Sequence, residues 1–382
     1  MKDGFIRVAA ATPDIHVADP QYNSEQIIEL MEQGSTRGVK VMAFPELCLT
    51  AYTCSDLFLQ ESLLREAKKE LKRILQASKS KDMILFVGMP WMHKGKLYNV
   101  AAVLNRGRIL GIVPKKHLPN YSEFYELRHF NPGMEKVEMT DWEGVQVPMG
   151  MNLLFACRTM PELVLAAELC EDVWVPCPPS ISHALAGATV IANCSASDET
   201  TGKDQYRYNL ICGQSARLVC GYIYANAGEG ESSQDLVFGG QNIIAENGTC
   251  LVQSDRFKNA CICADLDLGR IISERRRMTT FRDEENRSAS YETVYFELNT
   301  EDSAKKDSKK AGQKRDELLR YIDPAPFVPH DAGQRAPLRR DPFDPGNGTE
   351  KASGTYKLQT CSDRSFRRSG LHTGTSCNST CF

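Results

Sequence analysis

The sequence alternates short apolar runs with amphipathic segments, and this alternation constrains the fold more than any other feature. Buried strands are predicted for the runs "FIRVAAATP", "VKVMAFPE" and "MILFVGMPW". Helices are predicted for the amphipathic segment "NSEQIIELMEQGSTRG", with Asn23 as its N-cap, and for "DLFLQESLLREAKKELKRILQASKS". Strands and helices that alternate in this way indicate an α/β protein.

The same pattern continues to about residue 268. Strands are predicted for "NLLFACR", "LVLAAELC", "TVIANCSAS" and "YIYANAG", a helix for "YRYNLICGQSARLVCG", and a hairpin turning at Asn247–Gly248 for "QNIIAENGTCLVQ". Because no linker separates the two halves, we expect one layered domain over residues 1–300.

The composition changes after residue 300. Residues 301–340 are highly charged and are predicted to form a solvated linker. Residues 341–382 are rich in Gly, Ser, Thr, Arg and Asn and contain few large aliphatic side chains. Such a segment buries too little apolar surface to offset its loss of conformational entropy, so we expect a disordered or aberrant tail.

Charge and hydropathy exclude several classes of protein. The net charge of −3 disfavours a nucleic-acid-binding protein. No apolar run approaches the length of a membrane span, and the N-terminus lacks the pattern of a signal peptide, so we expect a cytoplasmic protein. Most of the 14 cysteines lie in apolar runs, where they behave as small buried hydrophobic residues. No CxxC pair occurs, and no metal site is predicted.

Cys170 is the candidate nucleophile. It ends an apolar run in "AELCEDVWVP", although the two acidic residues that follow it disfavour a thiolate. Glu46 in "MAFPELCLTAY" and Lys115 in "GIVPKKHLP" each follow a strand and a proline. A carboxylate of this kind can act as a general base, and an ammonium group can lower a thiol pKa and stabilise an oxyanion. We expect three neighbouring strand ends to bring these groups into one cavity.

A Cys–His pair is the alternative arrangement, with His117 or His183 as the base. Spacing along the sequence does not decide between a Cys–His pair and a Glu–Lys–Cys set. Cys177 is a weaker nucleophile candidate, because it lies in a proline-rich turn and does not directly follow a predicted strand.

Three segments together resemble the nitrilase (carbon–nitrogen hydrolase) superfamily, which uses a Glu, a Lys and a Cys: "FPELCLTAY", "PKKHLP" and "ELCEDVW". Longer segments are similar to the glutaminase half of glutamine-dependent NAD synthetases. They are "PKKHLPNYSEFYELRHF", "NCSASDETTGKDQYRYNL" and "ESSQDLVFGGQNIIAENG". The likeness extends from residue 5 to about residue 330 and implies a four-layer αββα sandwich.

The resemblance also implies a mechanism in which Cys170 attacks the side-chain amide of glutamine. Glu46 would move the protons, while Lys115 and a backbone N–H after Cys170 would hold the oxyanion. Water would then hydrolyse the thioester, without any cofactor. The positions that match the family's glutamine pocket and inner shell are Tyr52, Tyr121, Glu126, Glu171 and Ser197. Glu126 resembles the glutamate that braces the lysine, with Glu123 as its competitor for that role.

The second half of such synthetases binds ATP and deamido-NAD through a Ser-Gly-Gly-x-Asp-Ser loop, which the sequence does not contain. We therefore expect the synthetase domain to be absent and the final residues to be unrelated to it. The family resemblance also leads us to expect a homo-oligomer. Two other functions are open at this point: an amidase for another linear amide, and a catalytically inert interaction module left by truncation.

Overall fold

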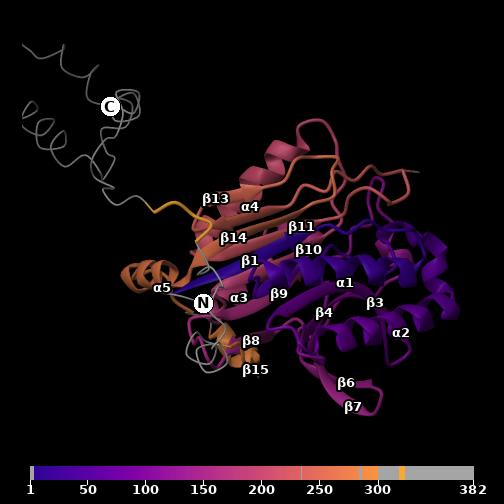
Figure 1. Ribbon diagram of the computed structural model, residues 1–382, viewed down its shortest axis with the longest axis horizontal. Coiled ribbons are helices and arrows are strands. Elements are labelled where there is room, and N and C mark those ends of the chain that lie inside the picture. The colour runs from indigo at the N-terminus through magenta and orange to yellow at the C-terminus, as the bar shows by residue number, and fades with distance from the viewer. Residues whose placement is uncertain (1–3, 234, 284–285, 300–317, 323–382) are drawn as a thin grey trace, which may run out of the picture. The chain divides into compact units, whose positions relative to one another are not determined.

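The structure, a computed structural model, describes residues 4–233, 235–283, 286–299 and 318–322 (Figure 1). The described residues up to Arg320 belong to one compact unit, which is built around two β-sheets. A second unit, Tyr321–Phe382, has Tyr321 and Ile322 as its described residues, and both are exposed.

The first sheet has eight strands in the order β14–β1–β2–β3–β4–β5–β7–β6. Its strands span Phe5–Ala11 (β1), Val41–Ala43 (β2), Ile84–His93 (β3), Lys96–Asn105 (β4), Arg108–Pro114 (β5), Glu138–Trp142 (β6), Val145–Met149 (β7) and Cys261–Asp267 (β14). Strands β1, β2 and β3 run parallel to one another, whereas β4 is antiparallel to both β3 and β5. The ends of β2, β3 and β5 therefore lie at the same edge of the sheet.

The second sheet has seven strands in the order β13–β12–β11–β10–β9–β8–β15. Its strands span Leu153–Cys157 (β8), Val164–Leu169 (β9), Val190–Ser195 (β10), Gly221–Asn226 (β11), Ile243–Glu246 (β12), Thr249–Gln253 (β13) and Glu292–Phe296 (β15). Strands β9, β10 and β11 are parallel, so their ends also share one edge.

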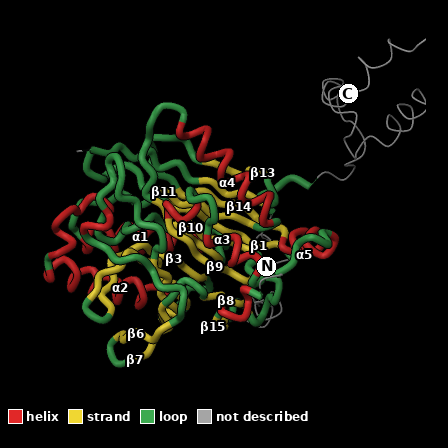
Figure 2. The backbone as a smooth tube through the Cα atoms, turned by 180° about the vertical axis from the view of Figure 1, so that it is seen from behind, coloured by secondary structure: helices red, strands yellow, loops and turns green. Residues whose placement is uncertain are grey.

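Helices cover the outer faces of both sheets, as Figure 2 shows. The α-helices span Pro20–Thr36 (α1), Glu61–Ser78 (α2), Pro179–Leu185 (α3), Lys203–Leu218 (α4) and Leu268–Arg277 (α5). Short 3₁₀ helices span Tyr52–Leu59 (η1), Glu126–Arg128 (η2), Cys170–Val173 (η3) and Arg287–Ser290 (η4). The α1 and α2 side chains pack on the first sheet, and the α3 and α4 side chains pack on the second.

The period-two alternation of strand residues explains the layers. In β1, Val8 and Ala10 belong to the core between the two sheets, whereas Ala9 and Ala11 pack with Ile27 of α1. The second sheet is arranged in the same way, with its inward side chains in the shared core and its outward side chains beneath α3 and α4. The predicted α/β class and the four-layer αββα sandwich are confirmed.

The predicted N-cap of the first helix is wrong. Helix α1 begins at Pro20, and Asp19 is its N-cap, with a side chain that accepts a hydrogen bond from the Tyr22 N–H at 3.0 Å. Asn23 lies one turn inside the helix, where its buried amide bonds both the N–H and the carbonyl of His16 and also the Leu49 carbonyl. Proline at the first helical position favours the earlier start.

The predicted linker (301–340) and tail (341–382) lie outside the described residues, apart from residues 318–322. In that short stretch, the Leu319 N–H donates to Asp265 at 2.6 Å, and the Arg320 guanidinium donates to Glu246 at 2.8 Å. Within the described part of the chain, no helix combines the length and the apolar character needed to cross a membrane.

Candidate active site

Glu46 follows β2, and its side chain is fully buried. Its Oε1 atom accepts hydrogen bonds from Asn99 Nδ2 and Lys115 Nζ, both at 2.6 Å. Its Oε2 atom accepts from the Ala196 N–H at 3.0 Å. Three donors from separate segments therefore fix the position of this carboxylate.

Gly88 in β3 lets the loop that carries Glu46 pass close to the sheet. A Cβ atom added at Gly88 would stand 2.2 Å from the Pro45 carbonyl oxygen and 2.4 Å from the Leu47 nitrogen. Such distances are far shorter than van der Waals contact, so the close approach requires glycine.

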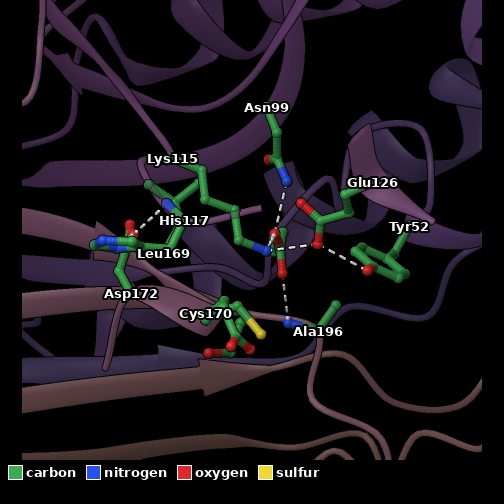
Figure 3. Close-up of polar contacts among 12 residues, drawn as sticks. Tyr52, Asn99, Lys115, His117, Glu126, Leu169, Cys170, Asp172 and Ala196 are labelled. Carbon is green, nitrogen blue, oxygen red and sulfur yellow. Dashed lines mark hydrogen bonds and ion pairs between the residues drawn. The ribbon is translucent and has the colours of Figure 1, made fainter. Parts of the chain in front are cut away.

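Lys115 follows Pro114 at the end of β5 and is also fully buried. Its Nζ atom donates to Glu46 and Glu126, in both cases at 2.6 Å, and the Tyr52 hydroxyl donates to the same Glu126 oxygen at 2.8 Å (Figure 3). Burial lowers the pKa of Lys115, but the two carboxylates more than offset this effect and raise the pKa well above its usual range. The ammonium group is therefore charged.

Burial raises the pKa of Glu126 to about 7, despite the opposing effect of the Lys115 charge. One cation thus faces two buried carboxylates, and burial favours the protonated form of Glu126. The Oε2 atom of Glu126 has no hydrogen-bond partner among the described residues.

Cys170 begins the turn η3 directly after β9, and only 6% of its surface is exposed. Its φ angle is 39°, a left-handed conformation that a side chain makes costly. Its N–H donates to Asn193 Oδ1 at 3.2 Å. Figure 3 shows the sulfur pointing towards the backbone nitrogen of Ala196.

Burial raises the pKa of the Cys170 thiol well above its usual range. The Glu46 carboxylate raises this pKa further, while the Lys115 ammonium lowers it. The resting sulfur is therefore a neutral thiol, which needs a base to become a nucleophile. Glu46 accepts a hydrogen bond from the Ala196 N–H, towards which the sulfur also points, so this carboxylate is the candidate base.

The three candidate groups come together, but not from three neighbouring strands, and the prediction is wrong in this detail. Glu46 and Lys115 belong to the first sheet, where β3 and β4 separate β2 from β5. Cys170 belongs to the second sheet. The site therefore lies where strand ends of two facing sheets meet.

The five predicted pocket residues occupy three places. Tyr52 and Glu126 join the Lys115 cluster. Tyr121 and Glu171 pair with each other at the exposed rim, where the Tyr121 hydroxyl donates to Glu171 Oε1 at 2.8 Å. The fifth lies in another buried network.

That fifth residue is Ser197. Its hydroxyl oxygen accepts from Arg207 at 3.3 Å, and its N–H donates to Asn226 Oδ1 at 2.8 Å. Glu126 is the glutamate that contacts Lys115, whereas Glu123 lines an adjoining cavity of about 90 Å³. The lining of this cavity also includes Tyr52, Phe58, Phe124, Glu126 and Phe130.

The histidines of the alternative arrangement bond elsewhere. The Nδ1 atom of His117 lies 2.9 Å from an Asp172 oxygen, and the Nδ1 atom of His183 lies 2.7 Å from the Tyr291 hydroxyl. In the described residues, no hydrogen bond joins either ring to Cys170. The geometry therefore favours the Glu–Lys–Cys set.

Sequence reasoning missed two groups that hold Glu46. Asn99 is an amide inside the apolar strand "KLYNVAAVLN", and that isolated polar residue was a usable signal. Ala196 contributes its backbone N–H, which leaves no trace in the sequence. Among the described residues, no group of three or more His, Cys, Asp or Glu side chains is arranged to hold a metal ion.

Comparison with known proteins gives the site a family context. A family model for carbon–nitrogen hydrolases matches residues 7–276. A curated relative from Mycobacterium tuberculosis, named glutamine-dependent NAD(+) synthetase, is 40% identical over 334 residues, which cover 86% of this chain and 48% of the relative. The Aquifex aeolicus protein of the same name is 31% identical over 279 residues, covering 73% and 45%. The chain thus spans about half the length of the curated relatives it matches.

Comparison with solved structures indicates the same family as the sequence comparisons. A glutamine-dependent NAD(+) synthetase from Cytophaga hutchinsonii matches with a TM-score of 0.62 and 29% identity, covering 68% of this chain and 43% of that chain. An amidase from Nesterenkonia sp. matches in fold, with a TM-score of 0.55 and 20% identity, covering 72% and 97%. The resemblance inferred from the sequence is confirmed, and this chain belongs to the carbon–nitrogen hydrolase family.

Proposed function

We propose that this chain hydrolyses the side-chain amide of glutamine to glutamate and ammonia through a thioester on Cys170. Its ammonia would supply glutamine-dependent NAD synthesis from deamido-NAD. The observation that carries the proposal is the buried Glu46–Lys115–Glu126 cluster whose charges act on the Cys170 sulfur. The choice of glutamine is supported by relatives named glutamine-dependent NAD(+) synthetase.

In the first step, Glu46 takes the thiol proton and the Cys170 sulfur attacks the amide carbon. The carbonyl oxygen becomes an oxyanion, which the Lys115 ammonium and the N–H after Cys170 stabilise. Because the site is nearly closed to water, these fixed charges act in a medium of low dielectric constant and stabilise the developing charge strongly. Glu126 and Tyr52 hold the lysine in place.

In the second step, the carbon–nitrogen bond breaks, and Glu46 passes its proton to the leaving nitrogen as ammonia departs. Water, deprotonated by Glu46, then attacks the thioester carbon. The carbon–sulfur bond breaks, the thiol regains its proton, and glutamate is released. The amidase step uses the side chains and a backbone N–H of this chain, and it requires no cofactor.

We assign Tyr121, Glu171 and Ser197 to the part of the pocket that holds the amino-acid end of glutamine. ATP and deamido-NAD would bind a synthetase domain whose phosphate-loop motif this sequence lacks. We retain residues 1–300 as the hydrolase domain, 301–340 as a linker and 341–382 as an unrelated tail. We also propose a homo-oligomer in the cytoplasm.

The decisive experiment measures glutamate release by the purified chain and by Cys170→Ala. The wild type should release glutamate and the variant should not, while Cys177→Ala, which removes an exposed thiol, should behave as the wild type. A glutamine-like diazoketone should add once, at Cys170, as peptide mass mapping will show. Equal release by wild type and Cys170→Ala would remove the nucleophile assignment.

Two further measurements separate the alternatives. A panel of linear amides with an ammonia readout tests the choice of substrate, and a preference for another amide would replace glutamine. Absence of both an adduct and ammonia release would indicate an inert interaction module. Formation of NAD from glutamine, ATP and deamido-NAD by the chain alone would contradict an activity limited to the amidase step.

A further inference from the structure

We propose that Asp172 is a positioning residue: its buried carboxylate fastens the lysine-bearing end of β5 to the cysteine-bearing turn after β9. The proposal rests on the proposed amidase function for its kinetic readout, whereas a second readout, the reactivity of the thiol, does not depend on glutamine hydrolysis.

The Asp172 carboxylate accepts four hydrogen bonds, all from the two segments that carry catalytic candidates. Its Oδ1 atom accepts from the N–H and the Nδ1 atom of His117, both at 2.9 Å. Its Oδ2 atom accepts from the Leu169 N–H at 3.1 Å and the Lys116 N–H at 3.4 Å. Figure 3 shows Asp172 next to His117 and Leu169, on the far side of the Cys170 backbone from the sulfur.

The placement of these donors makes the contact specific. Lys116 is the residue after Lys115, and Leu169 is the residue before Cys170. Strands β5 and β9 belong to different sheets, so no strand-to-strand hydrogen bonds join the two segments. A single side chain, 1% exposed, therefore joins the two catalytic strand ends through four hydrogen bonds, whereas the other side-chain bond described between these segments, from Tyr121 to Glu171, lies at the exposed rim.

The left-handed backbone of Cys170 strengthens this inference. A strained residue keeps its conformation only when its surroundings hold it. The bond from the Leu169 N–H to Asp172 closes the turn around Cys170, and the bonds from residues 116 and 117 tie that turn to the Lys115 segment. Catalytic groups must be held to within about 0.5 Å of their working geometry.

A purely electrostatic role and a positioning role predict opposite effects when the Asp172 charge is removed. Loss of a nearby negative charge by itself lowers a thiol pKa and speeds the reaction of the sulfur with electrophiles. Loss of positioning moves the sulfur away from Lys115 and Glu46, and so slows that reaction. The direction of the change therefore distinguishes the two roles.

The test compares wild type with Asp172→Asn, whose amide group places donors against backbone N–H donors. The rate of Cys170 alkylation by iodoacetamide is measured by peptide mass mapping across neutral pH, alongside kcat and KM for glutamine. We expect alkylation and kcat both to fall by about tenfold to a hundredfold, with KM within about twofold, as a small displacement of catalytic groups predicts. Exposed Cys177 provides an internal reference for reagent activity.

The matched control is Asp265→Asn. Asp265 is another buried carboxylate, which accepts from the Arg7 guanidinium and the Leu319 N–H away from the site. Asp265→Asn should lower the free energy of unfolding in urea about as much as Asp172→Asn does, while the rate of Cys170 alkylation stays at the wild-type value. If Asp172→Asn does not fold, His117→Gln removes one of the four bonds and should slow alkylation in the same direction by a smaller factor.

Faster or unchanged alkylation of Cys170 in Asp172→Asn, or in His117→Gln where the first variant does not fold, would overturn the proposal. The same result in Asp265→Asn as in Asp172→Asn would also overturn it, because the effect would then follow stability alone. If the wild type does not hydrolyse glutamine but Asp172→Asn still slows alkylation, the proposed function fails and the positioning role stands.

Discussion

Gly88→Ala should damage the site through the backbone rather than through a catalytic side chain. The new Cβ atom would lie 2.2 Å from the Pro45 carbonyl oxygen, and heavy atoms approach a Cβ no closer than 3.0 Å. The loop must therefore retreat from β3 by about 0.8 Å, the difference between these two distances. Pro45 and Leu47, which the Cβ meets first, flank Glu46, so the catalytic carboxylate moves with them.

A shift of this size is large enough to disturb the hydrogen bonds that position the Glu46 carboxylate. If it falls along the 2.6 Å bonds that Glu46 accepts, those bonds lengthen to about 3.4 Å, near the limit for a hydrogen bond. Misplacement by about 1 Å costs on the order of a hundredfold in rate, so we expect kcat for glutamine to fall about tenfold to a hundredfold. Overpacking should also lower the free energy of unfolding by about 1–3 kcal/mol.

The assay combines steady-state glutamate release with urea unfolding. The matched control is Gly213→Ala in α4, where an added Cβ meets nothing within 4 Å. That change should leave kcat unchanged and stabilise the protein by about 0.5–1 kcal/mol, since alanine favours a helix over glycine. If Gly88→Ala keeps both the wild-type kcat and the wild-type stability, the close approach of β3 to the Glu46 loop is refuted.

Three further predictions follow from buried or rim contacts. Lys115→Met leaves two buried carboxylates without their cation and should lower the free energy of unfolding in urea by about 3–5 kcal/mol. Adding Glu126→Gln should restore part of this loss, whereas an unchanged urea midpoint in Lys115→Met would contradict the buried pairing. Burial raises the pKa of Glu168 from 4.5 to about 7, so the stability that this group contributes is full below pH 4.5 and is lost as pH rises through 7. The free energy of unfolding of Glu168→Gln, taken relative to that of the wild type, should therefore rise by about 3 kcal/mol over this range. A difference that does not change with pH would exclude the effect. Tyr121→Phe removes the rim bond to Glu171 and should raise KM for glutamine about fivefold, equivalent to about 1 kcal/mol, with kcat unchanged; a loss confined to kcat would place Tyr121 in the chemistry instead.

The strand ends were predictable because each candidate residue directly follows an apolar run. Glu46 and Lys115 come after "VMAFP" and "GIVP", and Cys170 comes after "LVLAAEL", so local sequence alone places them where strands stop. The sheet to which each strand belongs was not predictable. Strand pairing joins residues that are far apart in the sequence. Phe5 of β1 pairs with Asp267 of β14, for example, and the sequence pattern around Phe5 does not predict that partner.

The hydrogen-bond partners of individual polar side chains also could not be predicted from the local sequence. Asn23 has the residue type of an N-cap, but its amide instead joins the helix to two neighbouring loops, and Asp19 caps the helix one turn earlier. The acidic residues after Cys170 looked like obstacles to its activation. Their side chains turn to separate partners, Glu171 to Tyr121 and Asp172 to His117, and only the folded backbone determines those directions.

The division of the site between two sheets has a consequence for how the enzyme matures during synthesis. The ribosome delivers Glu46 and Lys115 first, but the sheet that carries them is completed only when β14 pairs with β1. Cys170 arrives on the other sheet, so a nascent or half-folded chain holds a sulfur with no base and no cation beside it. The proposed amidase activity should therefore emerge late and in a single event, when the two sheets dock, and partly folded molecules should not hydrolyse amides.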